Sequence, residues 1–408
     1  MPRVNPKVFI WARETAGYEP PEAAGKLGLK DTKRQRGVDK LLAMERGETE
    51  PTRAQLLRMS QQYHRPLLLF YLDAVPVKGD RGEDFRTLPA NYSVTDDARV
   101  DAIVRDVRTR QDVLRSALEA EYEDDDEDRR SLEFIGARAM QGGVAAMVEY
   151  LRQVLGFSAA DFRRHPGVDE AFAFARARVE SIGVFVVLMG DLGSYHSAVD
   201  VNVFRGFALA DKTAPFIVIN DRDAREAWTF TLLHELAHLC LGLTGISAQR
   251  GDSAVEQFCN NVATEFLLPD AELATLAGQQ LRVVGMDSLR AAIEGIAGPR
   301  LLSRSLVAYR LLRVGFIHYE QWQEVSATFR DEWLENRQRE RERKRERDGG
   351  PNYYVVRRHR LGAALLSTVS RLLYEKELTT TKAALVLAIK PAHVAAMMAS
   401  GEKKNLVA

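Results

Sequence analysis

Two histidines and a glutamate near the middle of the chain have the spacing of a metal-binding catalytic motif. His234, Glu235 and His238 fit the pattern His-Glu-x-x-His. On a helix, residues four apart lie on one face, so both imidazoles can hold one ion while Glu235 projects beside them. Zn²⁺ suits imidazole ligands and keeps an open position at which water binds and ionises near neutral pH. The motif therefore predicts a zinc centre in which Glu235 takes the proton of the attacking water.

Two histidines and a water leave one protein ligand to be found, and two later glutamates are candidates. Glu256 and Glu265 lie nine residues apart, which is two and a half helical turns, so they cannot face the same ion. We prefer Glu256 as the ligand. Asn260 lies four residues later on the same face, where it can accept the second ring N–H of a ligating histidine. Glu265 remains the alternative, and it otherwise reads as a surface charge at a helix end.

Three further kinds of side chain are weaker candidates for chemistry. Cys240 and Cys259 stand in apolar surroundings, which is typical of buried structural thiols rather than ligands. If a zinc-bound water attacks a carbonyl, the site also needs a donor that stabilises the oxyanion. The sequence does not choose between Tyr195, His196 and His318 for that role.

The elements that must position the motif follow from its surroundings. The apolar flanks TFTLLHELAHLCLG predict a buried helix over 223–241, and a second helix over 255–268 stops at Pro269. β-Branched and aromatic runs predict two strands before the motif, with an edge strand between them, at 183–189, 215–219 and 205–209. These elements predict a mixed α and β unit.

Composition narrows the class of protein. Among 408 residues, Lys plus Arg equals Asp plus Glu at 57 each, so the net charge indicates no particular partner. No apolar run approaches the roughly 20 residues that span a bilayer, and Met1 to Gly17 shows no secretory signal. Neither of the two cysteines lies in a CxxC pair. We therefore expect a soluble cytoplasmic protein with reduced thiols and no membrane partner.

The motif and the helix after it resemble the ImmA/IrrE family of metallopeptidases. The segments TFTLLHELAH and VEQFCNNVATEFLLP carry the resemblance, which extends over about 182–316. It implies a zincin-like fold with His234, His238 and Glu256 as zinc ligands and Glu235 as the catalytic acid and base. It also implies limited proteolysis of a repressor that carries a helix-turn-helix, in a stress-response or mobile-element circuit.

The first 75 residues resemble the XRE type of helix-turn-helix domain. Short helices are expected at 7–15, 21–27, 38–45 and 53–63, and the segments LLAMERGETEPTRAQLLRMS and YHRPLLLFY carry the resemblance. Residues 1–66 hold 13 Lys and Arg against 8 Asp and Glu. Lys33, Arg34 and Arg36 precede the third helix, and such a basic cluster suits the phosphates of double-stranded DNA. Dimerisation or docking of a protein is the alternative role of such a unit.

Two highly charged segments are interpreted as solvent-exposed. The acidic run 121–128 follows a predicted helix over 100–118 and reads as a loop or helix end. The run RQRERERKRER at 337–347 predicts an exposed helix that holds the C-terminal tail at a distance from the catalytic domain. In that tail, a basic cluster is expected to be a solvated helix start, although it could bind phosphate: Arg357, Arg358, His359 and Arg360.

The sequence as a whole predicts an α+β fold with five segments. These are a helix-turn-helix domain (1–75), a linker (76–95), a zincin-like metallopeptidase domain (96–330), a charged helical spacer (331–350) and a helical tail domain (351–408). The function expected is a zinc-dependent endopeptidase that cleaves a transcriptional repressor. Two alternatives remain, namely a DNA-binding regulator with a structural or sensory metal site, and a member of a toxin–antitoxin or phage-defence pair. An intact Glu235 favours the enzyme, because a structural site needs no carboxylate aimed at water.

Overall fold

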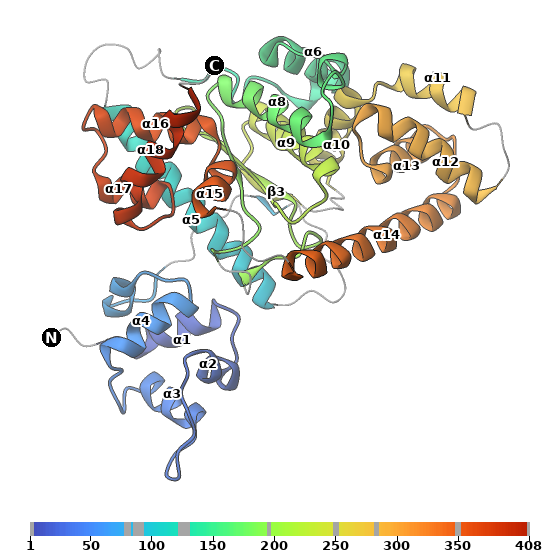
Figure 1. The fold of residues 1–408 in the computed structure, drawn as a ribbon. Helices are drawn as coiled ribbons and strands as arrows, with labels where there is room; N and C mark the ends of the chain where they lie inside the picture. Colours follow the sequence, from blue (N-terminus) through green and yellow to red (C-terminus); the bar gives the residue numbers. More distant parts are fainter. Residues whose placement is uncertain are drawn as a thin grey trace. The chain divides into compact units, whose positions relative to one another are not determined.

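The computed structural model describes residues 4–76, 83–84, 94–120, 131–193, 197–247, 253–280, 285–346 and 352–405. The chain forms two compact units (Figure 1). Unit 1 comprises Met1–Arg81, Leu88–Asp106 and Asp191–Val203, and unit 2 comprises Gly82–Thr87, Val107–Gly190 and Phe204–Ala408. The acidic run 121–128, most of the predicted linker 76–95, and the candidates Tyr195 and His196 lie outside the described residues.

Unit 1 begins with a small helical bundle in which each of the four predicted helices is present to within one residue. These helices are α1 (Pro6–Glu14), α2 (Pro20–Lys26), α3 (Gly37–Glu45) and α4 (Arg53–Gln62), followed by a 3-10 turn at Leu67–Tyr71. Thr52 and Gln55 form a capping box that begins α4. Apolar side chains such as Val8, Leu41 and Met59 form the core. The long helix α5 (Val94–Ala120) begins in unit 1 and ends in unit 2.

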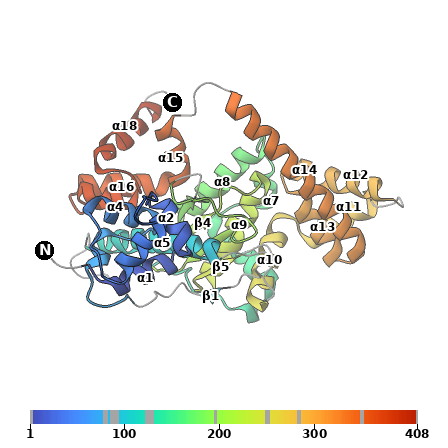
Figure 2. The ribbon, with the colours of Figure 1, turned by 90° about the horizontal axis from the view of Figure 1, so that it is seen from below.

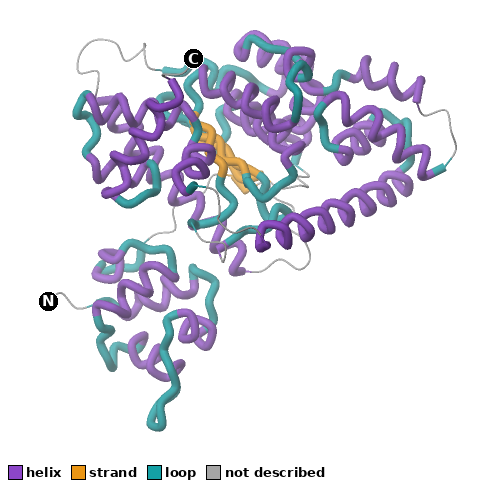
Figure 3. The backbone as a smooth tube through the Cα atoms, viewed as in Figure 1, coloured by secondary structure: helices purple, strands orange, loops and turns teal. Residues whose placement is uncertain are grey.

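Unit 2 is built on a small mixed sheet, drawn in orange in Figure 3. The strands are β1 (Glu83–Asp84), β2 (Phe185–Leu188), β3 (Gly206–Leu209), β4 (Phe216–Ile219) and β5 (Gly245–Ser247). Their order is β1-β5-β3-β4-β2, with β2 parallel to β4 and β3 antiparallel to both β4 and β5. Every residue of β2, β3 and β4 is buried, which explains why these strands are continuous apolar runs.

One strand lies elsewhere than the sequence predicts. The segment 205–209 was expected at an edge of the sheet, but β3 lies inside it between β4 and β5. Strand β5 is only three residues long and contains Gly245, so it has no apolar run that would have signalled a further strand.

Helices cover the sheet and extend beyond it. The helices before and beside the motif are α6 (Gly143–Leu155), α7 (Ala159–Phe162), α8 (Val168–Ser181), α9 (Arg225–Cys240) and α10 (Ala254–Leu267). The next group is α11 (Asp270–Gln280), α12 (Met286–Ala297), α13 (Arg304–Arg313) and α14 (Tyr319–Glu346). The last is α15 (Tyr353–Leu361), α16 (Ala363–Tyr374), α17 (Thr380–Val386) and α18 (Val394–Asn405). Figure 2 shows the last two groups as separate clusters of helices.

No single helix in the described ranges is long and apolar enough to cross a membrane. The bent pair Thr380–Val386 and Pro391–Ala399, with an angle of 91° between its halves, satisfies the same length and composition criteria when taken together.

The C-terminal tail packs on the sheet and on α8 of unit 2, which corrects the expectation that the spacer holds it at a distance. Helices α15 and α16 contact β2, and α16 also contacts α8. Arg176 of α8 donates to the carbonyl oxygen of His359 at 2.6 Å. Glu180 accepts hydrogen bonds from the backbone N–H groups of Ala363 and Ala364, each at 3.1 Å, and so caps α16. The spacer is helical as predicted, but the chain returns after it to the edge of the sheet.

The basic cluster of the tail is engaged by the protein itself. Arg357 donates to the carbonyl oxygens of Leu387 and Ala388, at the end of α17. Arg358 donates to the carbonyl oxygen of Met397, and Arg360 pairs with Asp221 at 2.7 Å. Cations suit the C-terminal end of a helix, where backbone carbonyls lack intrahelical partners. This cluster therefore stabilises the tail rather than standing free in solvent.

The ion pair between Arg176 and Glu180 is nearly buried, and we expect its loss to destabilise the whole of unit 2. Its side chains are 9% and 6% exposed, with a separation of 3.0 Å. Glu180→Ala should lower the free energy of unfolding by about 3–5 kcal/mol, because it leaves Arg176 buried without its counter-ion. Urea denaturation followed by circular dichroism measures this change.

The exposed pair Arg371–Glu375 on α16 provides the control for this measurement. Its side chains are 41% and 37% exposed. Glu375→Ala should cost at most about 1 kcal/mol. Equal losses for Glu180→Ala and Glu375→Ala would contradict the anchoring role of the buried pair.

Candidate metal centre

Helix α9 carries the motif through the middle of unit 2. It packs against β3, β4, α8 and α10, and every residue from Ala227 to Cys240 except Phe230 is buried. Its C-terminal end is held by the loop before α6. The carbonyl oxygens of Leu239 and Cys240 accept the backbone N–H groups of Gly136 and Arg138, each at 3.0 Å. These bonds satisfy two carbonyls that have no partner within the helix, and they fix the position of the motif.

Helix α10 supplies the third candidate ligand from its first turn. Ser253 precedes the helix, and its hydroxyl accepts the backbone N–H of Glu256 at 3.2 Å. This cap sets the start of α10 and therefore the point at which Glu256 projects. A carboxylate in the first helical turn is also favoured by the helix dipole.

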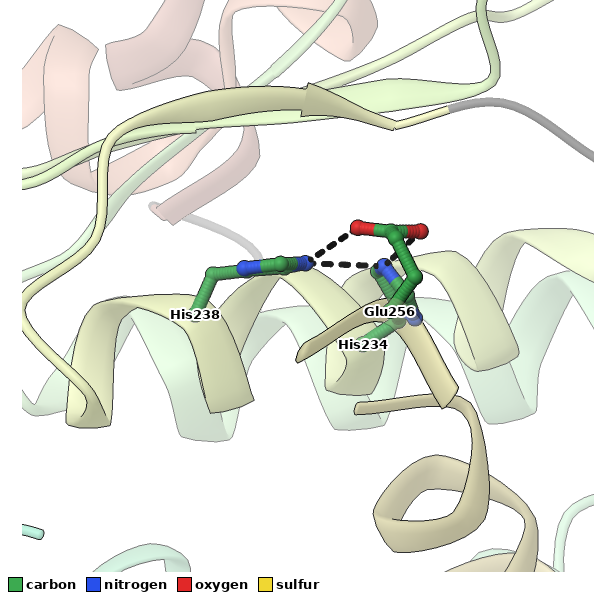
Figure 4. Close-up of side chains that lie close together, drawn as sticks. All are labelled: His234, His238 and Glu256. Atoms are coloured by element: carbon green, nitrogen blue, oxygen red, sulfur yellow. Dashed lines mark hydrogen bonds and ion pairs between the residues drawn. The ribbon is translucent and has the colours of Figure 1, made fainter. Parts of the chain in front are cut away.

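The side chains of His234, His238 and Glu256 point toward one another (Figure 4). The two Nε2 atoms are 3.1 Å apart. Glu256 places one carboxylate oxygen 2.9 Å from Nε2 of His238 and the other 3.4 Å from Nε2 of His234. A tetrahedral ion with bonds of about 2.0–2.1 Å separates its ligand atoms by about 3.3 Å. The three side chains therefore fit one zinc-sized ion, and all three are buried.

The charges within this group favour the metal-binding forms of Glu256 and His238, the carboxylate anion and the neutral imidazole. Burial alone would raise the pKa of Glu256, but hydrogen bonds from the two imidazoles outweigh it and lower this pKa to about 2. Burial lowers the pKa of His238. Burial also acts to lower the pKa of His234, but its hydrogen bond to Glu256 prevails and this pKa lies above its ordinary value. The carboxylate is therefore an anion near neutral pH, which suits binding of a divalent cation.

Glu235 occupies a recess that depends on a glycine in the neighbouring strand. Its side chain is fully buried under β3, opposite Gly206. A Cβ atom at Gly206 would lie 2.9 Å from Oε1 of Glu235 and 2.7 Å from the methyl group of Thr231. Only glycine allows α9 to approach β3 this closely. The only signal of this requirement in the sequence is a glycine near the start of a predicted strand, which does not by itself reveal the contact with Glu235.

The structure separates the remaining candidate residues into distinct roles. Asn260 lies close enough to His234 to contribute, after Glu256 and Glu235, to the raised pKa of that histidine. Glu265 instead accepts a hydrogen bond from Arg310 at 2.9 Å and so joins α10 to α13. His318 is exposed and precedes α14, and its backbone N–H donates to Gln321.

The two cysteines are buried and take no part in the metal-binding group. Burial raises the pKa of Cys240 to about 12 and also raises the pKa of Cys259. Within the described residues, the group of His, Cys, Asp and Glu that could hold an ion comprises His234, His238 and Glu256. The three basic candidates for DNA contact, Lys33, Arg34 and Arg36, are exposed in unit 1.

Comparison with known proteins identifies one domain. Residues 187–286 match the family model Peptidase_M78, the IrrE N-terminal-like domain. The match includes β3, β4, α9, β5 and α10, and with them all three candidate ligands and Glu235. It supports the resemblance to the ImmA/IrrE family and suggests a metallopeptidase. No curated protein and no solved structure matches the chain.

The choice of the third ligand can be tested on the purified protein. Wild-type protein purified without chelators should hold about one zinc per chain, bound by three protein ligands. Glu256→Ala should weaken zinc binding by more than about 100-fold, which exceeds the usual effect of losing a hydrogen-bond partner of a ligand. Elemental analysis and competition with a chromogenic chelator measure both quantities.

Glu265→Ala provides the matched control, because it removes a carboxylate from the same helix. Its contact with Arg310 predicts reduced stability with normal zinc content. Equal loss of zinc from the two variants would contradict Glu256 as the ligand.

The recess at Gly206 generates a second prediction. Gly206→Ala should lower the free energy of unfolding by about 1–3 kcal/mol, because the added methyl group overpacks the contact with Glu235. Zinc content should stay near one per chain, since the methyl group meets Thr231 and Glu235 rather than the ligands. The control is Gly278→Ala in α11, where a Cβ atom meets nothing within 4 Å. This control should keep or slightly increase the free energy of unfolding. Similar effects of the two substitutions would contradict the requirement for glycine at position 206.

Proposed function

We propose that this protein is a zinc-dependent endopeptidase that makes specific cleavages in a protein target. The observation that carries the proposal is the convergence of His234, His238 and Glu256 on one ion-sized site, with Glu235 buried on the same helix. The Peptidase_M78 match over 187–286 supports the same class of activity.

The proposed chemistry assigns a separate task to each side chain. When bound, zinc supplies a Lewis acid that polarises a peptide carbonyl and lowers the pKa of water. His234, His238 and Glu256 hold and orient it, and we assign to Asn260, which lies near His234, the task of helping to position that histidine. Glu235 accepts the proton of the attacking water and then gives that proton to the leaving amine, as one group acting first as base and then as acid.

A purely structural metal site explains the arrangement less well. Structural zinc sites are closed by four protein ligands. In the described part of the chain the group contains three, which leaves a fourth position for water or substrate. A fully buried Glu235 also costs desolvation energy that a structural site has no reason to incur. These two features favour catalysis over a structural or sensory role.

We further propose that the target is a transcriptional repressor with a helix-turn-helix. This proposal rests on the resemblance of the motif region to the ImmA/IrrE family, which the match to the IrrE N-terminal-like domain supports. Cleavage would relieve repression in a stress-response or mobile-element circuit. Membership of a toxin–antitoxin or phage-defence pair is compatible with the same activity.

Replacing the catalytic carboxylate tests the proposed enzyme. Glu235→Gln keeps the size of the side chain and removes the base, so zinc should remain bound while cleavage falls at least about 100-fold. Cells producing either form are compared by mass spectrometry of newly formed protein N-termini. New N-termini should cluster in one regulator and be present with the wild type alone. Casein, a general protease substrate, should be cut poorly by the wild type and by Glu235→Gln, because the proposed role demands one specific target.

Glu226→Gln is the matched control, because it makes the same chemical change at an exposed position of α9. It should cleave like the wild type. The peptidase mechanism fails if Glu235→Gln yields the same new N-termini at the same rate.

A further inference from the structure

Unit 1 carries an unusually long connection between α2 and α3. Helix α2 ends at Lys26 and α3 begins at Gly37, so ten residues, 27–36, join them. The turn of a helix-turn-helix has three or four residues. Figure 1 shows the connection as a narrow loop that projects from the helices of unit 1. We call residues 30–36 the basic arm.

The basic arm is held in one conformation by its own hydrogen bonds. At its tip, the backbone N–H of Thr32 donates to the carbonyl oxygen of Gln35 at 2.9 Å. At its base, Asp31 accepts the backbone N–H of Gly37, and Lys40 donates to the carbonyl oxygen of Lys30, each at 2.6 Å. An arm that is ordered before binding loses little conformational entropy on contact with a partner.

A glycine is required where the arm returns to the helices. A Cβ atom at Gly37 would lie 1.9 Å from the carbonyl oxygen of Leu29. The two ends of the arm are therefore closed against each other as tightly as the backbone permits. This close contact, together with the hydrogen bonds, indicates that the arm is an ordered loop.

The tip of the arm presents two cations that the protein does not use. Lys33 and Arg34 are the central residues of the turn, and both are exposed. In the described part of the chain their side chains make no hydrogen bond or ion pair. The nearby acids are engaged elsewhere, since Asp31 binds the backbone of Gly37 and Asp39 pairs with Arg36 at 3.1 Å. That leaves two positive charges side by side at the end of a rigid arm.

Helix α3 offers no comparable set of polar side chains. It contains three charged residues, and each has a partner within unit 1. Asp39 pairs with Arg36, Lys40 donates to the carbonyl oxygen of Lys30, and Glu45 pairs with the buried Arg13 at 2.6 Å. A recognition helix reads DNA through polar side chains directed at base edges. Helix α3 therefore lacks the side chains for direct readout of a sequence.

The composition of the arm favours phosphate over a protein surface. From Lys30 to Arg36 the arm contains no apolar side chain. A protein interface needs a buried apolar centre, whereas phosphate groups need only accessible cations. The excess of Lys and Arg in residues 1–66 adds long-range attraction for a polyanion.

We infer that the basic arm binds the phosphate backbone of duplex DNA through Lys33 and Arg34, without reading its sequence. The arm thereby replaces the recognition helix as the contact element. Arg36 is a structural residue that fixes Asp39, not a phosphate ligand. This inference is independent of the proposed peptidase activity, because it concerns unit 1 alone.

Salt-dependent binding of the full-length protein tests the inference. Fluorescence anisotropy follows a labelled DNA duplex of mixed sequence between about 50 and 200 mM salt. The double variant Lys33→Ala/Arg34→Ala should flatten the slope of log affinity against log salt by about 1.8, at about 0.9 per lost phosphate contact. Affinity at about 50 mM salt should then fall on the order of 100-fold.

Two control variants make the result specific to the tip. Lys7→Ala/Arg53→Ala removes the same charge from exposed positions on α1 and α4. Arg36→Ala removes a charge from the arm but not from its tip. Both should change the slope by less than about half of one contact. Thermal melting of each variant should match the wild type, since the removed side chains are exposed.

Several outcomes would overturn the inference. Equal losses in the two double variants would show diffuse attraction without a specific contact. Unchanged binding by Lys33→Ala/Arg34→Ala would show that the arm does not contact the DNA. Binding of the tip to vesicles of anionic lipid in the absence of duplex binding would assign the arm to a membrane surface. A preference of more than about tenfold for one duplex sequence would indicate base readout instead.

Discussion

Three candidate ligand atoms from two helices lie about 3 Å apart, and much of unit 2 serves to keep them there. The helical repeat brings His234 and His238 together on α9. No local rule brings Glu256 to them, because it belongs to α10 and its position depends on how the two helices pack. The Ser253 cap sets the residue at which α10 begins. The hydrogen bonds that the last carbonyl groups of α9 accept from the loop before α6 hold the end of that helix in place. An error of 1 Å in either helix would spoil the geometry of an ion with bonds of about 2 Å.

The site concentrates polar groups in a region that otherwise excludes water. Glu235 and Glu256 are fully buried beside two buried imidazoles, and burial of charge is unfavourable unless partners compensate for it. The hydrogen bonds between Glu256 and the histidines provide part of that compensation, as the low pKa of Glu256 indicates. The rest of unit 2 must supply the net stability. Its sheet has three fully buried strands, and its tail is anchored on Arg176 and Glu180.

The sequence predicted the features that depend on local periodicity. The two helices of the site, the three longest strands and the four short helices of residues 1–75 follow from spacing, capping and composition. The features that were missed depend on contacts between distant segments. Gly206 meets Glu235 across 29 residues, and Glu180 caps a helix that begins 183 residues later. Short strands such as β5 were not predicted either, because three residues are too few to show the alternation or apolar run that indicates a strand.

The position of the tail has a consequence for the order in which parts of the protein fold during synthesis. Ribosomes release the chain from its N-terminus, and early segments fold before later ones exist. The helical bundle of residues 4–76 can form its core while the rest is still being synthesised. Strand β2, by contrast, stays uncovered on the side of α15 and α16 until residues 353–374 have been added. The two helices of the candidate metal centre, α9 and α10, thus emerge before the helices that cover this edge of the sheet. A nascent chain can therefore meet a metal ion while this edge of its sheet is still open to solvent.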